Sequence, residues 1–195
     1  MFQFNFQDRK IGFALTGAYS TFELIIPYIK KLVENGAKVV PIMSFNSYNI
    51  DTRYGKSKDF IEKIEEITNN KIINTFVEAE PLGQKKIIDI LVIAPCTGNT
   101  VSKLANGITD TPVLLAAKSN LRNDNNIVLG ICTNDGLSSN AENIGKLLNR
   151  KHYYFIPFKQ DNPITKPRSL TFDLTYLIPT IEYALNNEQI QPILL

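Results

Sequence analysis

Residues 90–107 read ILVIAPCTGNTVSKLANG and indicate how the whole chain folds. Residues 87–94 predict a strand, and its apolar and β-branched run from residue 90 onward is typical of a strand buried on both faces. Thr97, Asn99 and Thr100 follow at the start of a helix predicted over residues 100–107. Open α/β sheets build ligand sites from such a strand, polar turn and helix N-terminus.

A second polar turn, TGAYST at residues 16–21, follows a strand predicted over residues 10–15. Its hydroxyl groups, its glycine and the start of the next helix are features that a phosphate group needs from a protein. The GxGxxG and Walker patterns are both absent from the sequence, so the turn favours a mononucleotide phosphate over a pyrophosphate. The alternative is a helix that begins after Thr21 and binds nothing at its N-terminus.

Strand and helix patterns alternate along the rest of the chain. Further strands are predicted over residues 37–43, 71–77, 111–116, 126–133 and 152–157, further helices over 24–33, 58–68, 141–148 and 176–185, and a loop over 161–168. This alternation predicts a single Rossmann-like, doubly wound α/β domain over residues 1–195, with a mainly parallel sheet and helices on both faces. The common strand order 3-2-1-4-5-6 would place the 10–15 strand beside the 87–94 strand, so the two polar turns should meet in one crevice.

Composition narrows the class of protein. The 195 residues carry a net charge of only +2, and the paired lysines have acidic neighbours, which is typical of solvated helix faces and argues against nucleic-acid binding. The two cysteines lack metal-site spacing and the chain has one histidine, His152, so no metal site is expected. No apolar run is long enough for a membrane span or a signal peptide, and we expect a cytoplasmic protein without membrane contact.

Several single residues have a functional and a structural interpretation. Ser44, after the 37–43 strand, either reaches a sugar-like hydroxyl of a ligand or caps the next turn. Asp135, in the Asn-Asp-Gly turn after the 126–133 strand, is either a general base or a turn residue. Cys96 is either a reactive thiol or, as we favour, a small buried residue. We interpret His152 as structural.

The motif at residues 16–20, the serine after the second strand and the pattern at residues 94–110 resemble the homo-oligomeric flavin-containing decarboxylases. That superfamily includes phosphopantothenoylcysteine decarboxylase and the flavin prenyltransferases. The resemblance implies a Rossmann-like fold that binds FMN between the protomers of a homo-oligomer. It also implies that the flavin site is lined by Thr16, Gly17, Ser20, Ser44, Thr97, Asn99 and Thr100.

Longer runs, at residues 51–56, 105–113, 133–137, 143–151 and 189–194, are similar to the family of dipicolinate synthase B subunits. This resemblance implies oxidation of a dihydrodipicolinate-type intermediate of the lysine pathway to dipicolinic acid, in the mother cell of a sporulating bacterium. It implies a partner as well, either the dipicolinate synthase A chain, a dehydrogenase-like protein that supplies NADP, or an electron-transfer flavoprotein subunit.

Two departures separate the chain from the decarboxylases. Their Pro-x-Met-Asn signature is missing from residues 116–123, and no histidine precedes His152. Decarboxylation of a cysteine-containing peptide is therefore disfavoured, and Asp135 is the candidate catalytic residue. Arg53, Lys118 and Arg122 are candidates for binding a dicarboxylate, with exposed surface cations as the alternative. An FMN-dependent decarboxylase and a non-catalytic stabilising subunit without flavin remain as other functions.

Overall fold

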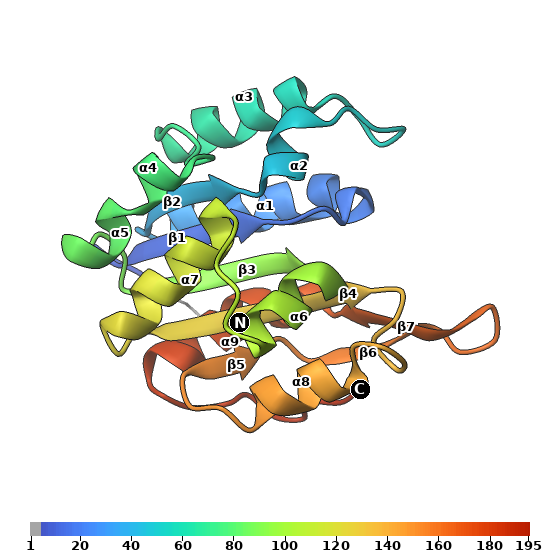
Figure 1. Ribbon diagram of the computed structural model, residues 1–195. Coiled ribbons are helices and arrows are strands. Elements are labelled where there is room, and N and C mark those ends of the chain that lie inside the picture. Colours follow the sequence, from blue (N-terminus) through green and yellow to red (C-terminus); the bar gives the residue numbers. More distant parts are fainter. Residues whose placement is uncertain (1–4) are drawn as a thin grey trace.

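One seven-stranded sheet organises the computed structural model, which describes residues 5–195 (Figure 1). The strands lie in the order β2-β1-β3-β4-β7-β6, and β5 pairs with β4. Their bounds are β1 Lys10–Leu15, β2 Lys38–Met43, β3 Ile90–Cys96, β4 Asn126–Thr133, β5 Tyr153–Phe155, β6 Phe158–Asn162 and β7 Lys166–Phe172. β1 to β5 pair in parallel, whereas β7 pairs antiparallel with both β4 and β6.

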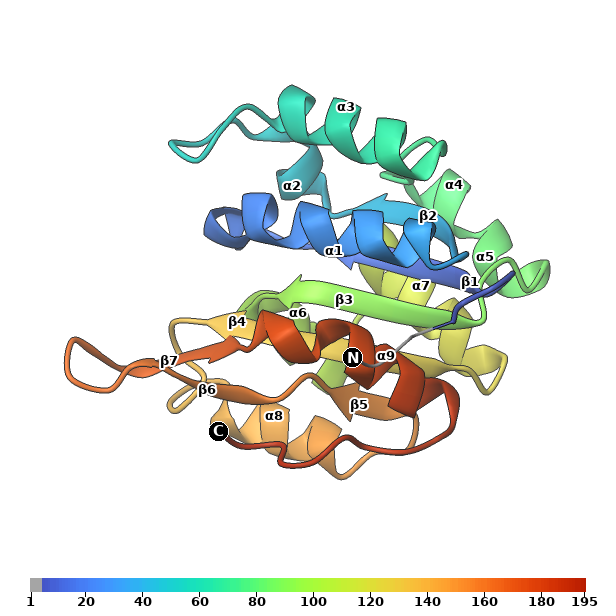
Figure 2. The same ribbon diagram turned by 180° about the vertical axis from the view of Figure 1, so that it is seen from behind.

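Helices cover both faces of the sheet. α6, α7 and α8 lie in front of it in Figure 1, and α1 and α9 lie on the opposite face, seen in Figure 2. The α-helices are α1 Phe22–Glu34, α2 Phe45–Asn49, α3 Ser57–Thr68, α4 Phe76–Ala79, α5 Pro81–Gln84, α6 Gly98–Ala105, α7 Pro112–Arg122, α8 Ala141–Leu148 and α9 Leu177–Leu185, with 3-10 turns at Tyr19–Thr21 and Leu174–Tyr176. The predicted doubly wound α/β architecture is confirmed.

β3 occupies the middle of the core, and all seven of its residues are buried. A strand covered by helices on both sides has no solvated face, which is why its sequence is apolar instead of alternating. β1 and β3 are parallel neighbours, with Ile11 opposite Ile90 and Ala14 opposite Ile93. The predicted adjacency of these two strands is therefore confirmed.

The strand predicted over residues 71–77 is wrong. Within this segment Ile73 forms only an isolated bridge with Ile42. Thr75 then caps α4: its hydroxyl accepts from the Glu78 amide, and the Glu78 carboxylate accepts from the Thr75 amide. This capping box satisfies amide groups that a strand would have paired with a neighbour, so the chain turns into a helix.

The strand predicted over residues 111–116 is also wrong, because this apolar run opens helix α7. Thr111 is the N-cap, and its Oγ1 accepts from the Leu114 amide at 3.3 Å. Pro112 occupies the first helical position, where its missing N–H costs nothing. A short buried helix and a buried strand have the same apolar composition, and the capping residues distinguish them.

The loop predicted over residues 161–168 is instead the tip of the β6–β7 hairpin. The Asn162 side-chain oxygen accepts from the amides of Ile164 and Thr165 at 3.0 and 2.8 Å, which closes the turn. With two predicted strands absent and this hairpin added, the order 3-2-1-4-5-6 does not hold beyond the central strands. The hairpin extends past the sheet on the side where β1, β3 and β4 end (Figures 1 and 2).

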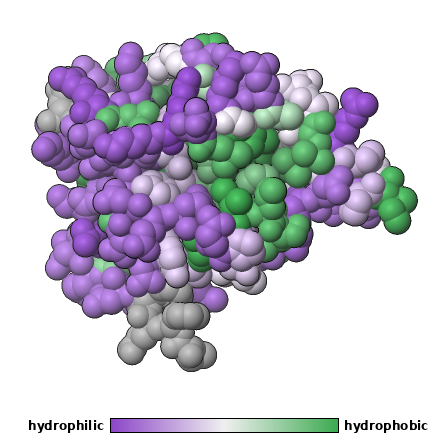
Figure 3. All heavy atoms as spheres, turned by 90° about the horizontal axis from the view of Figure 1, so that it is seen from below, coloured by the Kyte–Doolittle hydropathy of each residue, from purple (hydrophilic) through white to green (hydrophobic). Residues whose placement is uncertain are grey.

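The C-terminal segment folds back onto β6. The Phe158 amide donates to the Ile193 carbonyl, and the Leu195 amide donates to the Phe158 carbonyl, each at 3.1 Å. Seen from below, the molecule has an apolar area on the side where the C-terminus lies (Figure 3). Among the helices of residues 5–195, not one has the length and apolar character that crossing a membrane requires.

Candidate functional site

The Thr16 hydroxyl joins the ends of β1 and β3. Its Oγ1 donates to the Pro95 carbonyl at 2.7 Å and accepts from the Thr97 amide at 3.0 Å. The Thr16 amide donates to the same carbonyl at 3.3 Å. Thr16 is 1% exposed, so these bonds are shielded from water. The two polar turns that the sequence predicts to meet are thus held together by direct hydrogen bonds.

The first turn of α6 presents free backbone donors. Thr97 is the N-cap but makes no side-chain capping bond, and its Oγ1 lies 3.2 Å from that of Thr100. The internal ladder of the helix begins with the Val101 amide, which donates to the Thr97 carbonyl at 2.9 Å. The amides of Gly98, Asn99 and Thr100 precede that first bond. They form the positive end of the helix dipole and are suited to an anion.

The predicted catalytic residue Asp135 lies against this turn of α6. One carboxylate oxygen accepts from the Thr133 hydroxyl at 2.5 Å, and the other accepts from the Asn140 side chain at 2.8 Å. A Cβ atom on Gly98 would clash with all three of these side chains. Asp135 lines neither of the two clefts described next. Both oxygens of its carboxylate are engaged in hydrogen bonds, and one of them packs closely against Gly98.

The first cleft, of about 450 Å³, lies between the turn after β1, the start of α2 and the first turn of α6. Six of the predicted cofactor-binding residues line it: Thr16, Gly17, Ser44, Thr97, Asn99 and Thr100. Ser44 also caps α2, since its Oγ accepts from the Ser47 amide at 3.3 Å. The functional and capping interpretations of this serine are therefore compatible.

The first cleft has an aromatic edge and a charged edge. Phe45 lines the cleft and is 39% exposed, and its ring centroid lies 6.2 Å from that of Phe76. On the other side the Lys103 ammonium lies 2.7 Å from the Asp110 carboxylate. Asp110 and the neighbouring Thr111 also line the cleft, although the sequence placed them only within the family motifs and not among the site residues. Thr111 is the first residue of the strand predicted over residues 111–116, so its role as the N-cap of a helix was not predicted.

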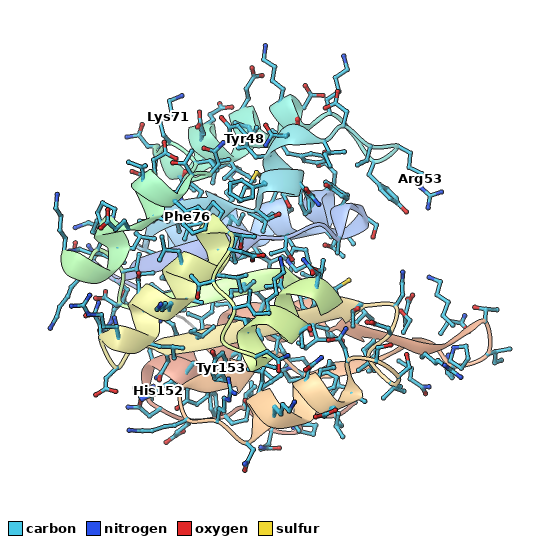
Figure 4. The ribbon with its side chains drawn as sticks, in the orientation of Figure 1. Tyr48, Arg53, Lys71, Phe76, His152 and Tyr153 are labelled. Carbon is cyan, nitrogen blue, oxygen red and sulfur yellow. The ribbon has the colours of Figure 1, made fainter. Side chains whose placement is uncertain are left out.

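The second cleft, of about 730 Å³, adjoins the first, because Gly17 and Thr97 line both. Its walls are the turn after β1, the loop that carries Arg53, the end of β4 and the β6–β7 hairpin. Ser20 and Arg53, predicted for cofactor and substrate, line this cleft. Figure 4 shows Arg53 extending away from the sheet, on the side toward which the hairpin projects.

Lys118 and Arg122 do not join the other predicted site residues. α7 begins at Pro112, beside the first cleft, and ends at Arg122. At a rise of about 1.5 Å per residue, Arg122 lies roughly 15 Å farther along the helix axis. Lys118 lines a third, shallow cleft of about 260 Å³, together with Arg150 and Tyr153, which adjoins the first cleft at Leu114 but shares none of its polar residues. Within one chain, Arg53 is thus the only one of the three predicted substrate cations that the described residues bring to the sheet edge.

Cys96 and His152 have structural environments. Cys96 is fully buried, and burial raises the pKa of its thiol, so the reactive thiolate is suppressed. His152 Nδ1 lies 2.8 Å from the Asn126 side-chain oxygen, and Nε2 lies 3.3 Å from the Asp124 carboxylate. These contacts are at the start of β4, the opposite end of that strand from the clefts. The favoured structural interpretations fit both residues.

The donor set defines what the site can bind. Backbone amides at a helix start, neutral hydroxyls and a carboxamide are suited to a phosphate or to sugar-like hydroxyls. The one lysine in the first cleft is paired with an acid, so positive charge there comes mainly from the helix dipole. An exposed phenylalanine beside these donors can contact a planar ring. Together these groups fit a phosphate-bearing planar ligand.

Comparison with known proteins gives the family. A model of the flavoprotein family matches residues 4–166. The dipicolinate synthase B subunit of Bacillus subtilis (strain 168) is 47% identical over 188 residues, which covers 96% of this chain and 94% of that protein. A shorter match, 31% identical over 110 residues, is to the coenzyme A biosynthesis bifunctional protein CoaBC of Thermococcus kodakarensis and covers 54% of this chain and 25% of that protein.

Solved structures agree with the sequence matches. The crystal structure of the dipicolinate synthase B subunit from Bacillus halodurans C superposes with a TM-score of 0.91 at 47% identity, over 98% of each chain. The apo form of Burkholderia xenovorans DmrB, described as a cubic protein cage for redox transfer, has a TM-score of 0.66 at 18% identity, over 92% of this chain and 96% of that one. The second likeness concerns the fold alone. From these matches, the chain belongs to the flavoprotein family and, within it, to the dipicolinate synthase B subunits.

Proposed function

We propose that this protein is the flavin-binding B subunit of a dipicolinate synthase and takes part in oxidising a dihydrodipicolinate-type ring to dipicolinic acid. One observation carries the proposal: the polar turns after β1 and β3 join through Thr16 and line one cleft, which is rich in hydrogen-bond donors suited to an anion. The 47% identity to the Bacillus subtilis protein supports the choice of reaction.

The cleft residues fit FMN. The amides and hydroxyls at the start of α6 and in the turn after β1 would hold its phosphate and ribityl groups, with Ser44 at the adjacent strand end. The predicted contacts are Thr16, Gly17, Ser20, Ser44, Thr97, Asn99 and Thr100. When bound, the flavin would supply a two-electron acceptor for a ring that gains aromaticity.

The protein's own side chains would bind and orient the substrate. Arg53 is the predicted carboxylate ligand that stands in the cleft next to the donor-rich turn. Asp135 has both carboxylate oxygens engaged with Thr133 and Asn140, which favours a positioning role for it over proton abstraction. The adjoining clefts would hold the planar substrate beside the cofactor, at the carboxyl edge of the sheet.

A partner completes the proposed enzyme. The dehydrogenase-like A chain of the synthase, or an electron-transfer flavoprotein subunit, would receive the electrons, and NADP would be reduced on the A chain. We further propose a homo-oligomeric, cytoplasmic protein. The exposed Leu194 and Leu195, 65% and 45% accessible on the C-terminal segment, are candidates for contact with another chain.

Reconstitution tests the proposed function. This chain and the dehydrogenase-like A chain would be purified together, stripped of flavin, and assayed for dipicolinate with and without added FMN. We expect dipicolinate formation to require both chains and to rise with FMN. Dipicolinate formation at the same rate with and without FMN would favour the alternative of a non-catalytic stabilising subunit. Carbon dioxide release from a cysteine-containing phosphopeptide-like substrate would favour the decarboxylase alternative.

A further inference from the structure

The second cleft brings together cations from two distant parts of the sequence. Arg53 and Tyr54 come from the loop between α2 and α3, and Lys166 comes from the start of β7, in the C-terminal part of the chain. All three line the cleft, which continues past Gly17 toward the proposed flavin site. A ligand in this cleft would therefore meet both loops and the donor-rich turn.

Arg53 keeps its charge available. Its Nη2 donates to the Tyr54 hydroxyl at 2.8 Å, and its guanidinium carbon lies 4.9 Å from the centre of the Tyr54 ring. Among the ion pairs of residues 5–195, not one includes Arg53. A guanidinium held by an aromatic ring but lacking an acidic partner retains donors for an incoming carboxylate.

Lys166 is already paired, but with an exposed acid. Its ammonium lies 2.6 Å from the Asp161 carboxylate, which belongs to the facing strand of the same hairpin. Asp161 raises the pKa of Lys166, and Tyr54 adds a smaller electrostatic contribution to this rise. The lysine of the hairpin and the tyrosine that contacts Arg53 thus line the same cleft.

We propose that Arg53 and Lys166 form a two-cation site for the substrate of the proposed function, with each cation binding one carboxylate of a planar pyridine-type dicarboxylate. Lys166 is the new residue in this assignment. The substrate carboxylate takes the place of Asp161 as the partner of Lys166, so Asp161 competes with the ligand. This inference rests on the proposed function and extends it to the substrate.

Because Asp161 competes with the ligand for Lys166, substitutions of these two residues should change the affinity for the ligand in opposite directions. Lys166→Gln removes a cation from the site and should weaken ligand binding. Asp161→Asn removes the competing anion and should strengthen binding. If the ion pair only stabilised the hairpin, both substitutions would act in the same direction. The opposite signs therefore distinguish a binding role from a structural one.

The experiment is a calorimetric titration of dipicolinate into the full chain loaded with FMN. Arg53→Gln and Lys166→Gln should each raise the Kd about ten-fold, as expected for a lost charge-assisted bond. Asp161→Asn should lower the Kd. Picolinate, which has one carboxylate, should respond to only one of the two cation substitutions.

Lys159→Gln is the matched control, because Lys159 lies on the same hairpin, is ion-paired with Asp173 at 3.4 Å and lines neither cleft. Its Kd should stay within about two-fold of the wild-type value. Equal Kd values for Arg53→Gln, Lys166→Gln and the control would overturn the inference, as would weaker binding in Asp161→Asn. FMN binding, followed by flavin fluorescence in the same variants, tests the proposed function separately.

Discussion

At the scale of single residues, Gly98 shows how closely the start of α6 is packed. A Cβ atom there would meet the side chains of Thr133, Asp135 and Asn140, each closer than 3.0 Å. Two of these side chains hold the Asp135 carboxylate, so they cannot move without breaking a hydrogen bond. Gly98 lies in helix α6 and has no positive φ, so its backbone conformation does not require a glycine. The close approach of these three side chains does.

We therefore predict that Gly98→Ala destabilises the protein by about 1–3 kcal/mol, as overpacking of a rigid contact does. Gly145→Ala in α8 is the matched control, because nothing lies within 4 Å of a Cβ at that exposed helical position. The control should gain about 0.5–1 kcal/mol from reduced chain entropy. Urea unfolding measures both, and equal stabilities for the two variants would contradict the packing argument.

Asp135 offers a second test at this scale. An asparagine in its place has one side-chain oxygen, so it can accept from Thr133 or Asn140 but not from both. Asp135→Asn should then lower stability by about 1–2 kcal/mol and weaken FMN binding, with turnover recovering at saturating FMN. A general base would behave differently: turnover would stay low at saturating FMN while stability and FMN affinity were unchanged. Urea unfolding and a dipicolinate assay over a range of FMN concentrations separate these outcomes.

At the scale of elements, α3 is joined to the segment after it by Glu65. One carboxylate oxygen accepts from the Ile72 amide at 3.0 Å, and the other contacts the Lys71 ammonium at 2.6 Å. The hydrogen bond from Lys71 lowers the pKa of Glu65 below its ordinary value of 4.5. A carboxyl group with a lowered folded-state pKa stabilises the fold above its unfolded pKa, and this contribution is lost as the pH falls through the folded pKa.

Glu65→Gln should therefore reduce the free energy of unfolding at neutral pH, by less than about 1 kcal/mol because the lysine is exposed. The difference from wild type should shrink as the pH is lowered from about 5 to about 3. Glu62→Gln, on the same helix and in the exposed pair with Lys58, is the control. A stability difference between wild type and Glu65→Gln that is independent of pH would contradict the assigned linkage.

Two helices show where apolar sequence patterns are insufficient to predict secondary structure. Residues 71–77 and 111–116 both have the apolar or β-branched composition of strands, yet both lead into helices. Thr75 with Glu78, and Thr111 with Pro112, supply the capping groups that decide the outcome. These signals are present in the sequence, but they occupy single positions and are outweighed by the longer apolar runs when periodicity alone is considered.

At the scale of the whole molecule, the first cleft was predictable and the second was only partly so. Thr16 and Thr97 lie at the ends of two buried parallel strands, and parallel topology brings such ends together. The hairpin wall of the second cleft depends on antiparallel pairing of Cys132 with Thr171. No local pattern specifies that long-range pairing, and it is what brings Lys166 to the site.

Titration of the flavin-free chain with FMN, followed by quenching of flavin fluorescence, measures whether the joined turns bind the cofactor. We predict saturable quenching by wild type with one FMN per chain. Thr97→Val, which keeps the shape of the side chain but removes its hydroxyl, should raise the Kd about ten-fold. An absence of saturable quenching, or equal affinity in wild type and Thr97→Val, would contradict the claim that the turns after β1 and β3 form the flavin site.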